Sequence, residues 1–168
     1  MSEGRFNMRY ETASMYRGMK EFQNEVGYTV QWYKFNKPAT TLDSIYDEGN
    51  VMSTSGGRRW YPPIPMPFIS ILRREGTESQ TETGFYTTDT IHLVGTSDQL
   101  RKAGLTGLDT DTDDPLLDRF IFNGVVFSPV SIQVEAHIEN RYHTIGLDAK
   151  EVDPAELIDD PDFAKYAL

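Results

Sequence analysis

The dipeptide Asn123-Gly124, with an apolar run on each side of it, is the feature that most constrains the fold. It lies within the stretch DRFIFNGVVFSPV. Asn-Gly tolerates the positive φ values that both central positions of a type I′ turn require, and such a turn joins adjacent antiparallel strands. Residues 131–139 then alternate, which predicts a strand with one buried face consisting of Ile132, Val134, Ala136 and Ile138. Residues 141–147 are expected to pair with this strand.

The rest of the chain adds one long helix and several further strands. Met15, Met19, Phe22 and Val26 recur at spacings of four, three and four, which predicts a helix over 11–26 with one apolar stripe. Residues 28–35, 67–74 and 85–94 are rich in aromatic and β-branched residues and are predicted to be strands, the last two of them paired. A short helix is expected over 96–103. The predicted fold class is mainly β, an antiparallel barrel or sandwich with an N-terminal helix.

Two segments have no sustained period. Residues 36–66 contain a Ser/Gly-rich centre and the run Tyr-Pro-Pro-Ile-Pro-Met-Pro, so they are predicted to be a long loop, which in compact domains is usually functional or partly disordered. The acidic C-terminal tail, residues 153–168, contains Asp-Pro pairs at 153–154 and 160–161, which are typical of helix starts. It forms either two short helical turns or a segment that becomes ordered on a partner. Residues 1–152 are expected to form a single barrel-like domain.

The net charge of −10 is confined to two blocks. Five aspartates lie between residues 109 and 118, and residues 148–168 carry seven acids against two lysines. Nucleic-acid binding draws most of its affinity from basic residues, so this charge argues against a dedicated DNA or RNA binder. It remains compatible with a protein that lets DNA pass without binding it. The absence of cysteine excludes disulfides and thiolate metal sites, and no apolar run approaches the length of a membrane span.

Candidate sites for chemistry are weak. Asp109, Asp111 and Asp113 begin like a calcium loop, but Asp114 and Phe120 stand where that loop needs Gly and Glu, so a solvated acidic loop is favoured. One strand face carries Glu135, His137 and Glu139, which fits either a cation site or a solvent-exposed face. Residues 56–59 (GGRR) fit either an anion cradle or a flexible turn. Because the common catalytic motifs are missing, the sequence predicts no enzyme, no cofactor and no metal site.

The segment Trp60-Tyr61-Pro62-Pro63-Ile64-Pro65 is extended by its prolines. A segment that is already extended loses little entropy when it docks on a neighbour, which makes Trp60 a candidate anchor between subunits. The alternative is a loop whose Trp covers its own barrel.

The order of several short motifs resembles the small head-to-tail connector, or stopper, proteins of long-tailed bacteriophages, especially those of phages that infect actinobacteria. The first motifs are VQWYKF at 30–35, IYDEG at 45–49 and GRRW with two prolines at 57–63. They are followed by DRF at 118–120 before the Asn-Gly turn, VF at 126–127 and LDA at 147–149. The resemblance covers most of the chain and rests on the order and spacing of these motifs.

The resemblance implies a β-barrel subunit with a long loop. The subunits would form a homo-oligomeric ring between portal-adaptor and tail proteins in the neck of the virion, after synthesis in the host cytoplasm. That ring would close the DNA channel after packaging and open on infection, with no membrane involved. The alternatives are a tail-terminator ring protein, a small ligand-binding barrel and a cofactor-free hydrolase. The candidate interface and gating residues are Tyr46, Asp47, Glu48, Arg58, Arg59, Trp60, Pro62, Pro63, Phe163 and Tyr166.

Two of these expectations concern acidic regions. Phe163 and Tyr166 are expected to dock the tail on an adjacent neck protein, since so short and polar a segment has no stable helix of its own in water. The acidic side chains of Asp109, Asp111, Asp113 and Asp114 are expected to face the channel, where they would repel the DNA backbone.

Overall fold

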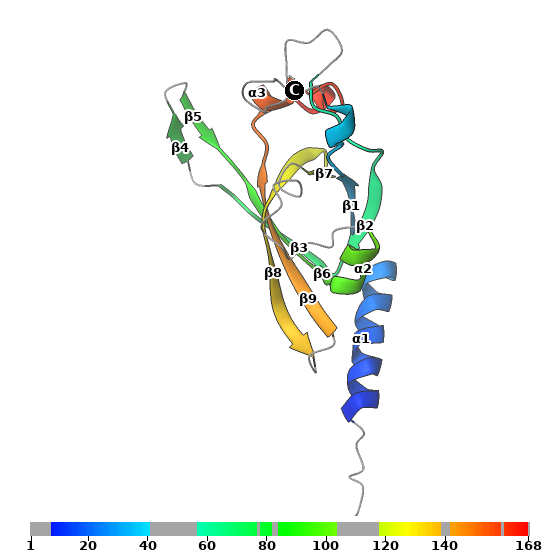
Figure 1. Cartoon of the computed structure of the whole chain (residues 1–168). Coiled ribbons are helices and arrows are strands. Elements are labelled where there is room, and N and C mark those ends of the chain that lie inside the picture. The colour runs from blue at the N-terminus through cyan, green and yellow to red at the C-terminus, as the bar shows by residue number, and fades with distance from the viewer. Residues whose placement is uncertain are drawn as a thin grey trace, which may run out of the picture.

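Seven antiparallel strands form one sheet that curls into a barrel (Figure 1). The computed structural model describes residues 8–40, 57–76, 78–81, 84–103, 118–138, 142–158 and 160–167. The strand order is β2-β1-β7-β8-β9-β6-β3, and the two edge strands β2 and β3 are separated in the chain only by Ile69. This arrangement confirms the mainly β fold and is a curled single sheet, not a sandwich of two sheets.

The helical elements are α1 (Met8–Glu25), η1 (Lys37–Ala39), α2 (Ser97–Lys102), α3 (Pro154–Ile158) and η3 (Ala164–Tyr166). The strands are β1 (Tyr28–Tyr33), β2 (Ile64–Phe68), β3 (Ser70–Arg74), β4 (Glu78–Thr81), β5 (Gly84–Thr87), β6 (Thr90–Thr96), β7 (Arg119–Phe122), β8 (Val125–Ile138) and β9 (Tyr142–Glu151).

The Asn-Gly hairpin is confirmed and begins the longest strand pair. Asn123 and Gly124 have φ values of 51° and 82°, and the turn joins β7 to β8. The strict alternation expected over 131–139 is interrupted at Glu135, because the pairing of β8 with β9 shifts register between Val134 and Ala136. This bulge leaves Glu135 as an extra residue on β8, and Ala136 is exposed.

Aromatic rings fill the barrel. Trp32 stacks on Phe120 with ring centroids 5.2 Å apart, and Phe120 stacks on Phe127 at 5.7 Å. Phe68 and Met66 of β2 are buried in the same core. The interior is therefore occupied by side chains from strands on both sides of the hairpin.

The proline-rich segment ends in a strand, where a loop to residue 66 was expected. Among the described strands, β2 pairs only with β1, in the register Val30↔Met66 and Tyr28↔Phe68. Because successive residues of a strand direct their backbone groups to opposite sides, Pro65 and Pro67 lie at positions that face away from β1. Proline is tolerated at such positions of an edge strand because no partner needs its missing N–H.

Helix α1 packs on the barrel through polar side chains. Tyr16 and Gln23 are buried, whereas the predicted stripe is largely exposed: Met15 is 63%, Phe22 48% and Val26 65% accessible. The Gln23 amide donates to the Pro67 carbonyl at 2.5 Å and accepts from the Thr96 backbone N–H at 3.1 Å. Lys20 pairs with Asp98 of α2. The periodicity of the sequence correctly predicted a helix here. Which face of the helix is buried depends instead on the hydrogen bonds of Gln23 to β2 and β6.

Two elements project from the barrel in Figure 1. Helix α1 extends from one end, and the paired strands β4 and β5 form a separate ribbon on another side. The base of the ribbon is held by Asp89, which accepts from Gly76 N at 3.0 Å and from Arg73 Nε at 2.5 Å. No helix in the described ranges is long and apolar enough to cross a membrane.

Candidate functional site

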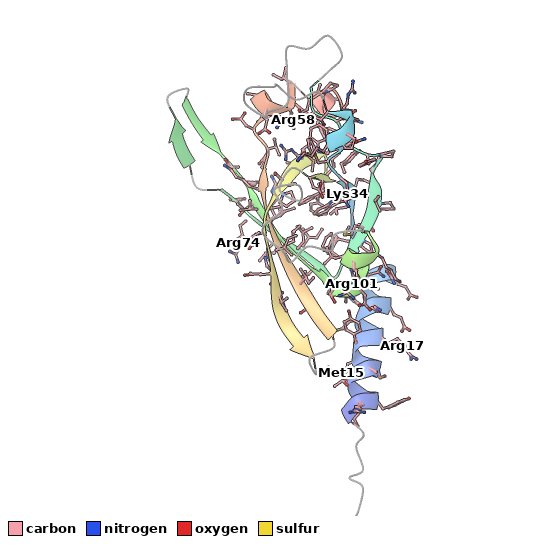
Figure 2. The ribbon with its side chains drawn as sticks, in the orientation of Figure 1. Met15, Arg17, Lys34, Arg58, Arg74 and Arg101 are labelled. Atoms are coloured by element: carbon pink, nitrogen blue, oxygen red, sulfur yellow. The ribbon has the colours of Figure 1, made fainter. Side chains whose placement is uncertain are left out.

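Several of the described interface candidates lie together at the barrel end that carries the C-terminal segment. Figure 2 shows Arg58 there, Arg58 pairs with Glu156 and Asp160 of that segment, and Trp60 and Phe163 belong to one apolar cluster. Backbone hydrogen bonds join residues 34–36 to residues 59–61, with Asn36 N donating to Arg59 O and Tyr61 N to Lys34 O. This pairing turns Trp60 toward the barrel and leaves Tyr61, Pro62 and Pro63 exposed. The exposed aromatic side chain of the proline-rich segment is therefore Tyr61.

Trp60 and Phe163 form the centre of a second apolar cluster in the same chain. Trp60 is only 7% exposed and Phe163 is fully buried, with their rings 4.8 Å apart and nearly perpendicular. Val126, Val152 and Leu157 complete the buried part of this cluster. The tail thus forms the short helical turns α3 and η3 and packs on its own barrel, and Phe163 is not available to a neighbouring protein. For Trp60, the observed burial matches the alternative of a Trp that covers its own barrel.

Arginine side chains fasten the tail to the barrel. Arg58 donates to Glu156 at 2.7 Å and to Asp160 at 2.8 Å, and Arg119 donates to Glu156 at 2.7 Å. The guanidinium carbons of Arg58 and Arg119 lie 6.0 and 5.9 Å from the Trp60 ring centroid. We refer to Arg58, Trp60, Arg119, Glu156, Asp160 and Phe163 as the tail clasp. Since Arg58 is committed to two carboxylates, it is not available for the anion cradle considered from the sequence.

Burial changes the pKa values of several clasp residues. It raises the pKa of Asp160, with Arg58 opposing the shift, and it lowers the pKa of Arg119 against the attraction of Glu156. One carboxylate oxygen of Asp160, Oδ2, is buried without a hydrogen bond among the described residues. These pKa shifts arise because apolar side chains enclose a network of ion pairs. Ion pairs that serve only the fold show such shifts too, so the shifts do not indicate catalysis.

Asp118 holds the start of β7 to β1. Its carboxylate accepts from Trp32 Nε1 at 2.9 Å and from Phe35 N at 2.8 Å, and burial raises its pKa. The DRF motif that contributed to the phage resemblance therefore has a structural explanation. Asp118 aligns Trp32 with Phe120, the residue on which Trp32 stacks.

Other candidates lie at the surface of this end or outside the described residues. Arg59 is partly exposed, 3.8 Å from Asp162, and Tyr166 is half-buried beside the second apolar cluster. Tyr46, Asp47 and Glu48 belong to residues 41–56, which lie outside the described residues. The acidic candidates Asp109, Asp111, Asp113 and Asp114 fall in residues 104–117, also outside them.

A histidine between two carboxylates was missed by sequence analysis. His92 on β6 contacts Asp148 of β9 through Nδ1 at 2.7 Å and Glu135 of β8 through Nε2 at 2.6 Å. Ser131 donates to the other oxygen of Asp148 at 3.0 Å. The Glu135 side chain crosses over Gly146, where an added Cβ would come within 2.5 Å of Glu135 Oε1. Glu135 was expected to share a face with His137 and Glu139. Its partner is instead His92, which only the order of the strands in the sheet brings close to it.

Hydrogen bonding favours the charged form of this histidine. The bond to Asp148 is the main cause that raises the pKa of His92, and the same bond lowers the pKa of Asp148. Both ring nitrogens can donate together only in the imidazolium form. Within the described part of the chain, no group of three or more His, Asp or Glu side chains is arranged to hold a metal ion.

Comparisons with solved structures give only weak likenesses. A chain from the "Virion of native gene transfer agent (GTA) particle" matches with a TM-score of 0.38 and 11% identity, over 74% of this chain and 94% of that chain. No family model and no curated protein matches the sequence. A likeness at this TM-score does not establish a shared fold, so the function proposed below rests on the residues of this chain.

Proposed function

We propose that this chain is a structural subunit of a bacteriophage virion. In the proposal, copies of it form a ring in the neck, between portal-adaptor and tail proteins, that retains packaged DNA and lets it pass on infection. The chain does no catalysis and needs no cofactor in this role. The proposal begins from the order of short motifs that resembles head-to-tail connectors and is supported by features of the fold.

The observation that carries the proposal is a filled barrel with elements that project from it. Trp32, Phe120 and Phe127 stack inside the barrel. An isolated two-stranded ribbon is at best marginally stable in water, yet β4 and β5 form such a ribbon beside the barrel. Helix α1 likewise leaves its apolar stripe exposed. Elements of this kind are typical of a subunit that is completed by assembly with other chains.

The filled barrel also argues against a small ligand-binding barrel, and the partners of the buried carboxylates argue against a cofactor-free hydrolase. A small ligand-binding barrel needs apolar positions that enclose a cavity, whereas here stacked aromatic rings occupy the interior. A cofactor-free hydrolase needs carboxylates with separated pKa values in a cleft. Asp118 and Asp160 have raised pKa values, but Asp118 holds Trp32 and Phe35, and Asp160 holds Arg58. Both carboxylates thus serve the fold.

The decisive experiment removes the chain from a phage that encodes it. We expect heads and tails to form separately, with heads that lose their DNA and tails of normal length, as seen by electron microscopy. Supplying the chain in trans should restore joined particles. Tails of abnormal length would favour the tail-terminator alternative, and normal, infectious particles without the chain would refute a structural role in the virion.

A further inference from the structure

Helix α1 exposes an apolar stripe with acidic neighbours. The helix stripe, defined as Met15, Met19, Phe22 and Val26, lies beside the face that packs on the barrel, and only Met19 is half-buried. At 3.6 residues per turn, Glu11 and Glu25 flank the stripe on its outer side, whereas Arg17 lies on the opposite side of the helix. The exposed surface next to the stripe is therefore negatively charged.

A second exposed surface has the opposite character. Leu72 of β3 is 54% exposed, and in the sheet register it shares the outer face with Arg74 of β3 and Lys150 of β9. Neither Arg74 nor Lys150 forms an ion pair among the described residues. Val130, the extra residue at the other bulge of β8, is also exposed. We call Leu72, Arg74, Val130 and Lys150 the sheet face.

The charges of the sheet face are partly balanced within the chain. Glu135 and Asp148 lie on the same side of the sheet, but both bind His92. With His92 charged, these two carboxylates leave one negative charge, part of which acts on Arg74, whose positive charge helps to lower the pKa of Asp148. Arg74 and Lys150 therefore give the sheet face a net positive charge of one, which favours an acidic neighbour. Figure 2 shows that Arg74 lies on one flank of the barrel and Met15 on the other, so the two surfaces are well separated.

We infer that the helix stripe of one copy packs on the sheet face of the next copy, an inference that rests on the proposed ring. The stripe offers Met15, Phe22 and Val26 with an acidic border, and the sheet face offers Leu72 and Val130 with a basic border. Complementary charge and apolar surface are what an interface between subunits requires. Two different patches on opposite flanks make a head-to-tail contact, which repeats from copy to copy and gives a ring when the rotation between neighbouring copies closes.

Crosslinking in assembled particles tests this contact, because the chain has no cysteine of its own. Particles with both Phe22→Cys and Leu72→Cys should yield, with a short bis-maleimide, a ladder of covalent oligomers that ends at the copy number of the ring. Either single variant should yield none, and a Thr29→Cys/Leu72→Cys pair serves as the matched control. Crosslinks with Phe22→Cys alone would overturn the inference, since they indicate helices paired about a two-fold axis.

The remaining outcomes separate the interface from the proposed function. Particles that contain the chain but give no ladder with the double variant would overturn the interface and leave the ring in place. Particles that do not contain the chain would refute the proposed function and the interface with it.

Variants of the purified chain give an independent measurement. Phe22→Asp should weaken self-association at least about tenfold, the loss typical of a buried interface aromatic, with an unchanged thermal unfolding midpoint because Phe22 is half-exposed. Arg74→Glu should weaken self-association several-fold, and more at low salt. Arg101→Glu on α2 makes the same charge reversal outside the sheet face and should have no effect. Equal effects of Arg74→Glu and Arg101→Glu, or full association of Phe22→Asp, would contradict the contact.

Discussion

Trp60 packs inside its own chain, so its replacement should act on folding. We expect Trp60→Ala to lower the free energy of unfolding by about 3–5 kcal/mol, the usual range for a core Trp. Tyr61→Ala, the neighbouring and exposed aromatic, should change it by less than about 0.5 kcal/mol. Urea unfolding of both variants measures the difference. A Trp60→Ala variant with the stability of the parent chain would show that Trp60 serves a contact with another protein.

At the same scale, His92 makes stability depend on pH. Because the folded pKa of His92 is raised, its contribution is fully present below the unfolded value of about 6.5 and is lost as the pH rises through the folded value. Asp148 has a lowered pKa, so its contribution is present above about pH 3.9 and is lost as the pH falls through its folded value. The charged pair of His92 with Asp148 should therefore contribute fully between about pH 3.9 and 6.5.

The measurement is the thermal unfolding midpoint from pH 4 to 9 for the parent chain and for His92→Gln. The midpoints should differ most near pH 5–6, and the difference should shrink as the pH rises past the folded pKa of His92, which an NMR titration of its ring protons locates. A difference that stays constant over this range would contradict the charged form assigned to His92.

At the scale of elements, the C-terminal segment is part of the core. Deleting residues 153–168 removes Leu157 and Phe163 from the second apolar cluster, and each buried side chain of this size contributes about 1.5–3 kcal/mol. The deletion also removes Glu156, the carboxylate that pairs with Arg119. We expect a less stable barrel, a lower unfolding midpoint and a red-shifted Trp fluorescence as Trp60 meets water. Lys165→Ala, which replaces an exposed side chain of the same segment, is the control. A truncated chain with unchanged midpoint and fluorescence would show that the tail is a dispensable appendage.

The elements also show which parts of the fold were predictable. The Asn-Gly hairpin, the helix and the pairing of β3 with β6 depend on local chemistry and period, and the sequence predicts them. The strand at β2 was missed because prolines fit a strand only where one edge is free, and that depends on the order of strands in the sheet. The buried face of α1 was missed because its partners, Pro67 and Thr96, lie far away in sequence.

The candidate site was predictable only in part. Arg58, Trp60 and Phe163 do meet, and sequence motifs had singled them out, but their partners lie in the same chain. Glu135 was assigned to the wrong cluster because one extra residue in β8 changes which side chains face His92. Such a bulge has no signal in a pattern of alternating residues.

At the scale of the whole molecule, the five aspartates between residues 109 and 118 contribute half of the net charge of −10. Replacing Asp109, Asp111, Asp113 and Asp114 with Asn removes four negative charges from each subunit at nearly constant shape. If the loop faces the channel of the ring, particles should assemble and retain DNA but eject it more slowly, most clearly at low salt, where the Debye length exceeds the roughly 8 Å of physiological solution. Ejection followed by dye release from single particles measures this. A lower yield of assembled particles, with unchanged ejection kinetics in those that do assemble, would place the loop at an interface.

The prolines of β2 have a consequence for association between copies of the chain. An edge strand with free N–H groups can template the addition of strands from other molecules, which leads to amyloid-like association. Pro65 and Pro67 present no N–H at the outer side of β2, and the other edge strand, β3, ends in Arg73 and Arg74. Both edges of the sheet are thus poor templates for cross-β growth. A chain with such edges can reach a high concentration and still associate only through contacts between side chains.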